Sequence, residues 1–279
     1  MRPARWSGRS GGAARAWSSG LPALAPAFAV IAWIPAVLLL DSGATLGEQR
    51  LLGLASWALL AFLLWREDAL TRLQVGVVVV YATLVEYTFS AFLGTYVYRL
   101  HGDWLSFFDK VPSFVPPGHG LVYLAAVVLG RRLPGWSVPA AAVAVSTYAL
   151  WGLMFSPQLD VLGALWAGCL LWWLWRGRDK RVYAGALLVV TYLELLGTAI
   201  GTWTWQSHDP VLHWIAIGNP PSGAAGGYCF FDAAALAIAP VLLRWIHRPG
   251  GRRAPAGRSV HDTPPPADQT PRVASVEVG

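Results

Sequence analysis

The sequence contains few charged residues and few cysteines. Only 13% of its 279 residues are charged, about half the share that is usual in a soluble domain. A soluble fold of this size would need more charged side chains to cover its surface, so the composition excludes a water-soluble globular protein. Cys169 and Cys229 stand far apart in apolar segments, with no CxxC pair, which argues against a disulfide framework or a zinc site.

The chain is instead rich in apolar and aromatic residues. Hydrophobic residues make up 55% of it, and 16 residues are tryptophan, whose ring suits a membrane interface. The apolar runs are continuous rather than alternating, which predicts helices and not a barrel. We expect an all-α, polytopic transmembrane bundle of about eight helices, with seven as the alternative count. The expected helices cover 21–40, 51–65, 70–96, 120–130, 138–155, 161–175, 182–205 and 227–246, the fourth beginning near Pro116.

The basic residues are distributed unevenly between the expected loops. With the N-terminus in the cytoplasm, 18 of the 21 basic residues fall in cytoplasmic segments, as the positive-inside rule predicts. We therefore expect both termini to be cytoplasmic, with a basic segment at 1–20 and a disordered tail at 247–279. This distribution accounts for the net charge of +6 without a nucleic-acid partner. The excess of arginine over lysine, 19 to 2, is typical of a high-GC bacterium and predicts a bacterial plasma membrane.

The second half of the chain resembles the first. This similarity predicts two parallel four-helix repeats, 21–132 and 133–246, related by an axis along the membrane normal. The matches are Thr83 with Thr191, Glu86 with Glu194, Ser90 with Thr198, Gly94 with Thr202, and Tyr123 with Tyr228; with a slip of one residue, 94–98 match 201–205, and further on Pro116–Pro117 match Pro220–Pro221.

Glu86 and Glu194 stand inside expected membrane helices. A charge at the bilayer centre costs roughly 2.5–3.5 kcal/mol on insertion scales, and neither residue has a basic neighbour within a turn. Counted from the preceding arginines at about 1.5 Å per residue, both lie about 20 Å from the cytoplasmic side. We predict that they are catalytic. The alternative is that both are protonated and only hold the helices together.

Two further residues are candidate catalytic groups. Asp232 lies near the depth of the glutamates in the last expected helix. His119 lies at the outer mouth of the fourth, where an imidazole can shuttle protons. The alternative for His119 is a loop histidine in contact with water.

Small polar and aromatic residues near the glutamates are the predicted substrate-binding groups. Gly197 and Gly201 form a GxxxG pattern beside them, which is typical of close helix packing. The aromatic residues have an alternative role as a membrane-interface belt. The predicted substrate-binding residues are Ser90 and Thr198, on the glutamate stripe, and Tyr96, Tyr98, Trp203 and Trp205, at the outer ends of the helices expected at 70–96 and 182–205.

Sequence motifs for metal or cofactor binding are missing. The chain has no Walker loop and no HExxH, and His208, Asp209 and His213 lack the spacing of a helical ligand pair. We therefore expect neither a metal nor a cofactor.

The strings EYTFSAFLGTYVY (86–98) and ELLGTAIGTWTW (194–205) resemble a known pattern. Their glutamate, glycine and paired aromatic residues are similar to those of integral-membrane carotenoid-biosynthesis proteins of the carotenoid hydratase type. The resemblance covers about 15 residues in each half. It implies a lipid-soluble polyene substrate and the addition of water across a double bond.

A pair of buried carboxyl groups among aromatic rings suits cofactor-free protonation of a lipid or isoprenoid double bond. The sequence therefore predicts an enzyme of this kind, with membrane lipids and a lipid-soluble small molecule as partners. A small proton-coupled transporter or lipid flippase is the main alternative, because parallel repeats around intramembrane carboxylates are also found in carriers. A non-catalytic membrane scaffold is the second. The sequence leaves a homo-oligomer open.

Overall fold

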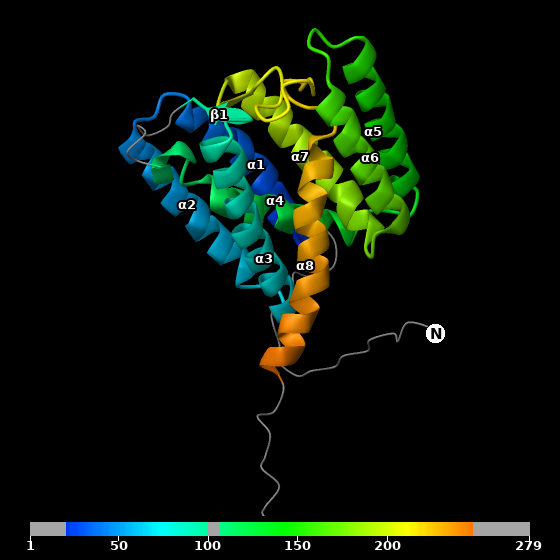
Figure 1. Ribbon diagram of the computed structural model, residues 1–279. Coiled ribbons are helices and arrows are strands. Elements are labelled where there is room, and N and C mark those ends of the chain that lie inside the picture. The colour runs from blue at the N-terminus through cyan, green and yellow to red at the C-terminus, as the bar shows by residue number, and fades with distance from the viewer. Residues whose placement is uncertain (1–20, 100–106, 248–279) are drawn as a thin grey trace, which may run out of the picture.

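The computed structural model describes residues 21–99 and 107–247, and the described chain forms an all-α bundle (Figure 1). Eight α-helices lie within the described residues, so the predicted fold class and helix count are confirmed. The predicted basic segment at 1–20 lies outside the described residues, as does the predicted tail beyond His247. The helices are α1 (Ala25–Asp41), α2 (Leu46–Leu64), α3 (Ala69–Glu86), α4 (Val115–Gly130), α5 (Ser137–Met154), α6 (Val161–Arg176), α7 (Lys180–Ile200) and α8 (Ala224–Ile246).

Shorter elements connect these helices. A π-helical segment, η2 (Tyr87–Phe92), continues α3, and two 3-10 turns, η1 (Leu21–Leu24) and η3 (Phe107–Lys110), precede α1 and α4. Two short strands, β1 (Tyr96–Tyr98) and β2 (Trp203–Trp205), follow η2 and α7. We call the end of the bundle that carries these strands the ribbon end, and the opposite end, with the connections at 65–68, 131–136 and 177–179, the basic end.

Local sequence signals account for several helix starts. Thr45 and Glu48 form a capping box on α2, in which the Thr45 backbone N–H donates to Glu48 Oε2 at 2.7 Å. The Asp68 side chain caps α3 by accepting the Thr71 backbone N–H at 2.7 Å. α4 begins at Val115, with Pro116 in its first turn, where the missing N–H of proline has no cost. The start expected near Pro116 is therefore confirmed.

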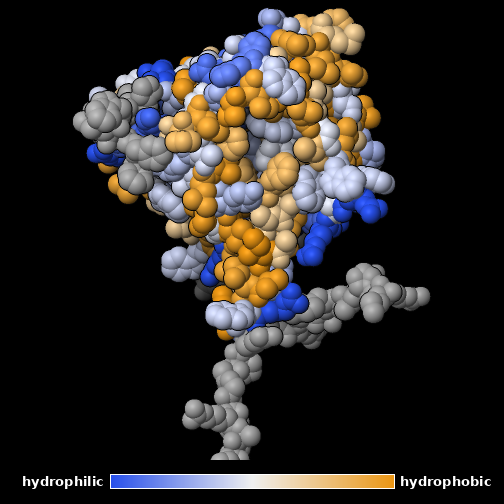
Figure 2. Space-filling model, in the orientation of Figure 1, coloured by the Kyte–Doolittle hydropathy of each residue, from blue (hydrophilic) through white to orange (hydrophobic). Residues whose placement is uncertain are grey.

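The surface has the character of a membrane protein. Four helical segments are long and apolar enough to cross a membrane: Ala69–Phe92, Ser137–Met154, Lys180–Ile200 and Ala224–Ile246. α1, α4 and α6 are apolar but shorter. Apolar side chains cover the middle of the face over α3 and α8, and the most hydrophilic residues lie mainly toward its margins (Figure 2). Large apolar side chains such as Phe92, Trp175 and Trp245 are exposed, which a lipid environment accommodates.

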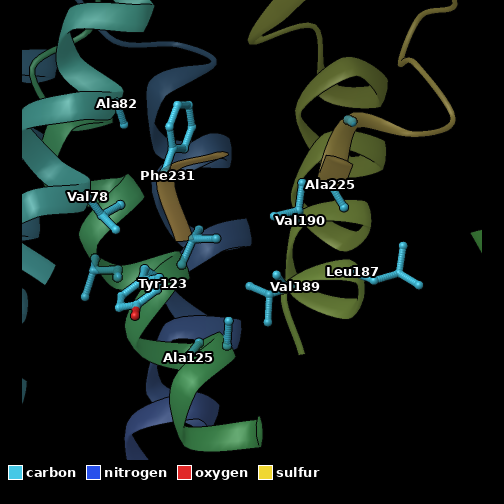
Figure 3. Close-up of a cluster of buried hydrophobic side chains, with 14 of the residues drawn as sticks. Val78, Ala82, Tyr123, Ala125, Leu187, Val189, Val190, Ala225 and Phe231 are labelled. Carbon is cyan, nitrogen blue, oxygen red and sulfur yellow. The ribbon is translucent and has the colours of Figure 1, made fainter. Parts of the chain in front are cut away.

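The core lies where α3, α4, α7 and α8 meet. α4 packs along α7, and α3 packs along α8. Tyr123 of α4 lies beside Val78 of α3 in this core, with Val190 of α7 and Phe231 of α8 nearby (Figure 3). A side chain at Gly185 of α7 would overlap the backbone of α4, so this glycine permits the close approach of the two helices.

The aromatic pairs do not end helices, contrary to the prediction. The helices expected at 70–96 and 182–205 stop earlier, because Gly94 and Gly201 adopt φ angles of +68° and +78°, which favour glycine. Each chain then enters a strand. Tyr96, Tyr98, Trp203 and Trp205 therefore lie on a two-stranded antiparallel ribbon formed by β1 and β2.

The register of this ribbon is symmetrical. Val97 lies opposite Thr204, with Tyr96 opposite Trp205 and Tyr98 opposite Trp203. Beyond the strands, the Gln206 N–H donates to the Thr95 carbonyl at 3.0 Å, and the Arg99 N–H donates to the Thr202 carbonyl at 2.8 Å. A two-fold axis through the Val97–Thr204 pair exchanges these partners. This register agrees with a parallel repeat, which itself stays a prediction.

Candidate functional site

A cavity of about 340 Å³ lies beneath the ribbon. Its walls include side chains of both strands and of α1, α3, α4, α7 and α8, and most of them are apolar or aromatic. Glu86, His119 and Glu194 line it. Of the described residues around the cavity, none is lysine or arginine. The predicted glutamates therefore face one shared, largely apolar space.

Glu86 is the last residue of α3 and is 5% exposed. Its Oε1 lies 2.8 Å from His119 Nε2, and its Oε2 accepts a hydrogen bond from the Tyr98 hydroxyl at 2.9 Å. The helix changes to the π-helical segment directly after Glu86. Such segments are frequent at functional sites. Both oxygens of this carboxyl group are thus held by side chains from other elements.

His119 lies inside α4 and not in a loop. It is the fifth residue of that helix and is 6% exposed, so the alternative of a loop histidine in contact with water is wrong. Its Nδ1 is buried and has no hydrogen-bond partner among the described residues. The rings of Tyr228 and Phe231 lie 5.2 Å and 5.6 Å from the imidazole. Glu86 therefore fixes one ring nitrogen and leaves the other unpaired.

Glu194 lies in α7 and is 4% exposed. Its Oε2 accepts hydrogen bonds from the indole Nε1 of Trp203 at 3.1 Å and of Trp205 at 3.2 Å. Its Oε1 accepts from the Tyr228 hydroxyl at 3.4 Å. Gly197, one turn along α7, provides the space for the Trp203 ring. Gly197 therefore makes room for the ring of Trp203, whereas the GxxxG pattern predicted close packing against another helix.

The two carboxyl groups have different neighbours. An indole N–H only donates, so Trp203 and Trp205 stabilise Glu194 as an acceptor. An imidazole both donates and accepts, so His119 can exchange a proton with Glu86. The site therefore combines one carboxyl group held by fixed donors with one carboxyl group coupled to a titratable ring.

Three predicted site residues do not line the cavity. Ser90 is buried in η2, and the Thr198 hydroxyl donates to the Glu194 carbonyl of its own helix at 2.7 Å. Asp232 is 4% exposed and lies one helical turn beyond Tyr228, away from the ribbon. Its Oδ2 has no hydrogen-bond partner among the described residues. Tyr96, Tyr98, Trp203 and Trp205 do line the cavity; their binding of a substrate stays a prediction.

The sequence analysis missed several residues of the site. Tyr228 bonds Glu194, and Trp166 contacts Trp205 with ring centroids 5.7 Å apart. Tyr228 had a signal, because it matched Tyr123 in the repeat, but a tyrosine in an apolar helix does not reveal which face it occupies. Asp160, which does not line the cavity, was not singled out either. It is 1% exposed and accepts three backbone N–H groups, from Gly163, Gly218 and Ser222.

Within the described residues, no group of three or more His, Cys, Asp or Glu side chains is placed to hold a metal ion. Comparison with known proteins returned no match among family models, curated proteins or solved structures. The function is therefore argued from the geometry of the cavity.

Proposed function

We propose that the protein is a membrane-embedded enzyme that protonates a carbon–carbon double bond of an uncharged, lipid-soluble substrate such as an isoprenoid or polyene, without a cofactor. One observation carries this proposal. Glu86 and Glu194 are both buried, face one apolar cavity, and differ in that only Glu86 is coupled to an imidazole.

The chemistry balances without a redox partner. The Glu86–His119 pair delivers a proton to one alkene carbon, so that a C–H bond forms from the π electrons and the neighbouring carbon becomes a cation. The faces of Trp203, Trp205 and Tyr228 can stabilise this cation, and the Glu194 carboxylate supplies a counter-charge. Loss of a proton from a different carbon completes an isomerisation or a cyclisation. Addition of water followed by loss of its proton completes a hydration.

The charge of the cavity favours this substrate class. Among its described lining residues, the titratable groups include two glutamates and a histidine but no lysine or arginine. A phosphate or carboxylate headgroup binds through lysine or arginine side chains, so the cavity disfavours an anionic lipid. The resemblance to carotenoid hydratase-type proteins further supports a polyene and a hydration.

The proposal is tested by replacing each glutamate in the native host. A deletion strain is complemented with the wild type, Glu86→Gln or Glu194→Gln, and the membrane lipids are compared by mass spectrometry. We expect each variant to accumulate the precursor that the deletion strain accumulates. Asp41→Asn is a matched control, because Asp41 is also a buried carboxylate but lies outside the cavity lining. Wild-type lipids in both glutamine variants would refute the carboxylate mechanism.

Incubation in D₂O of membranes that already contain the unlabelled precursor gives a second readout. A protonation step places solvent deuterium on a carbon of the product, and this label survives extraction because C–H bonds do not exchange in water. The product of the wild type is expected to gain deuterium that the precursor lacks. A product without additional deuterium would contradict protonation.

A proton-coupled carrier is the second candidate. It is favoured by the change of α3 to π-helical geometry directly after Glu86, because interrupted helices form the binding sites of many carriers. An unchanged lipid profile in the deletion strain together with altered uptake or export would support the carrier. Normal lipids and normal transport in both glutamine variants would leave a non-catalytic scaffold.

A further inference from the structure

Three aromatic side chains carry the lining of the cavity to the surface of the bundle. Of its described lining residues, only Tyr81, Phe89 and Phe230 are classed as exposed, at 37%, 41% and 44%. Tyr81 lies on α3, Phe89 on its continuation η2, and Phe230 on α8. α3 and α8 pack side by side, and Tyr81 contacts Phe231 edge-on with ring centroids 5.3 Å apart. Phe230 instead faces α6, where its ring centroid lies 6.4 Å from that of Trp173, so Tyr81 and Phe89 are the lining residues that reach the surface along the seam between α3 and α8.

The walls toward the ribbon end and toward α1 contain no exposed residue among the described lining. Toward the ribbon end, Tyr96, Trp203 and Trp205 are each at most 8% exposed. Toward α1, the lining residues Ile34 and Leu38 are 4% and 1% exposed. The described structure thus provides no comparable opening toward the ribbon end.

The length and apolar composition of the two helices that border the seam indicate that it faces lipid. Both Ala69–Phe92 and Ala224–Ile246 are long and apolar enough to cross a membrane. Apolar side chains on them, such as Leu84 and Ile238, are exposed. Figure 2 views this face, where the surface is hollowed beside the upper part of α8. A molecule that passes through the seam comes from the bilayer and not from water.

We propose that the ligand enters the cavity sideways from the bilayer, through an opening bordered by Tyr81 and Phe89, and that it is an uncharged hydrocarbon chain. The ligand class rests on the proposed function, whereas the route rests on the exposure of the lining. The cavity, at about 340 Å³, lies at the low end of the range for small-molecule sites. A long lipid would therefore place only its reacting segment inside and leave the remainder in the bilayer.

The test uses diphenylhexatriene, a neutral fluorescent polyene, with the protein in lipid nanodiscs. Tryptophans in the cavity wall transfer excitation energy to a bound probe, and a saturable signal reports binding above the linear background from probe in lipid. We expect saturable binding by the wild type and its loss in Gly227→Leu, which fills the cavity. Gly76→Leu is the matched control, since Gly76 is an exposed helical glycine of α3 that does not line the cavity. Equal saturable binding by both variants would refute occupation of the cavity.

The route is tested with single cysteines in a background that carries Cys169→Ser and Cys229→Ala. Phe89→Cys borders the opening, and Phe92→Cys is an exposed control that does not line the cavity. Each is measured before and after reaction with a bulky benzyl maleimide. We expect the modification to abolish saturable binding only at position 89. Unchanged binding by modified Phe89→Cys would refute the lateral route.

The ligand class is tested with two charged derivatives of the same probe. We expect the neutral probe to bind more tightly than both its trimethylammonium and its propionate derivatives. Tighter binding of either derivative would refute an uncharged ligand. These measurements need no turnover, so the route can stand while the enzyme proposal fails in the lipid profile, and the reverse also holds.

Discussion

His119 Nε2 lies 2.8 Å from Glu86 Oε1, although the two residues are 33 positions apart in the sequence. The contact joins the end of α3 to the first turns of α4. Both side chains are buried, so bulk solvent does not compete for this contact. This pair is therefore a structural link as well as the proposed proton donor.

Replacement of the imidazole should show this link in the unfolding free energy. We expect His119→Phe to destabilise the protein by about 3–5 kcal/mol, because it leaves Glu86 buried without its partner. Glu86→Gln added to His119→Phe should recover part of the loss. Denaturant unfolding in detergent of the wild type, both single variants and the double variant measures the coupling, expected at about 0.5–3 kcal/mol. Additive effects would contradict a direct link.

Gly197 should be essential for the position of Trp203. A Cβ at 197 would overlap the Trp203 ring, and such overpacking costs about 1–3 kcal/mol. We expect Gly197→Ala to lower the unfolding free energy by this amount in the wild type. In a Trp203→Leu background, where the ring is gone, the same change should cost much less. An equal cost in both backgrounds would indicate that another contact of Gly197 matters.

Asp160 should stabilise the ribbon end. Its carboxylate accepts N–H groups from the first turn of α6 and from the loop before α8, at 2.6–2.9 Å. Asp160→Ala leaves these donors buried without an acceptor, at about 1–3 kcal/mol for each group. Asp109→Ala is the control, because it removes a solvent-accessible ion pair with Arg50, which is worth about 0–1 kcal/mol. Thermal unfolding of the two variants in detergent should rank them in this order.

Asp232 should matter little for stability. Its Oδ2 has no hydrogen-bond partner in the described chain, so Asp232→Asn removes no visible bond and should change the unfolding free energy by less than about 1 kcal/mol. The lipid profile of a complemented strain then decides whether the residue has a functional role. A large loss of stability would reveal a partner of the carboxylate and would contradict this expectation.

The predicted orientation can be tested with an impermeant thiol reagent. Ser207 follows β2 at the ribbon end, and Arg178 lies at the basic end; both are exposed. In a cysteine-free background on intact cells, Ser207→Cys should react and Arg178→Cys should react only after the cells are opened. The reverse pattern would place the ribbon end in the cytoplasm.

The fold could be predicted because apolar runs and basic loops mark helices directly. The helix ends near the site could not, because the sequence pattern presents Gly201 as a packing residue and Gly94 only as a repeat match. The two glycines turn the chain out of a helix and into a strand, and β1 pairs with β2 across about 107 positions of sequence. The need for a positive φ angle at both glycines follows only from this pairing. A local pattern carries no information about such a distant partner.

The candidate site was predicted in part for a similar reason. Depth along a helix follows from counting residues, so Glu86 and Glu194 could be found. The face that a residue occupies does not follow when the helix is apolar all round, and Asp232, expected near the depth of the glutamates, does not line their cavity. The burial of His119 was hidden because a place in the first turns of α4 does not reveal that Glu86, Tyr228 and Phe231 pack around its ring.

The β1–β2 ribbon has a consequence for the product. In the proposed mechanism a cation forms beneath Tyr96, Trp203 and Trp205, which are buried and separate it from the ribbon end. A cation that meets water becomes an alcohol, and a cation that stays dry loses a proton and becomes an alkene or a ring. The ratio of these products would then be set by how often the two strands part, and not by the strength of the acid that starts the reaction.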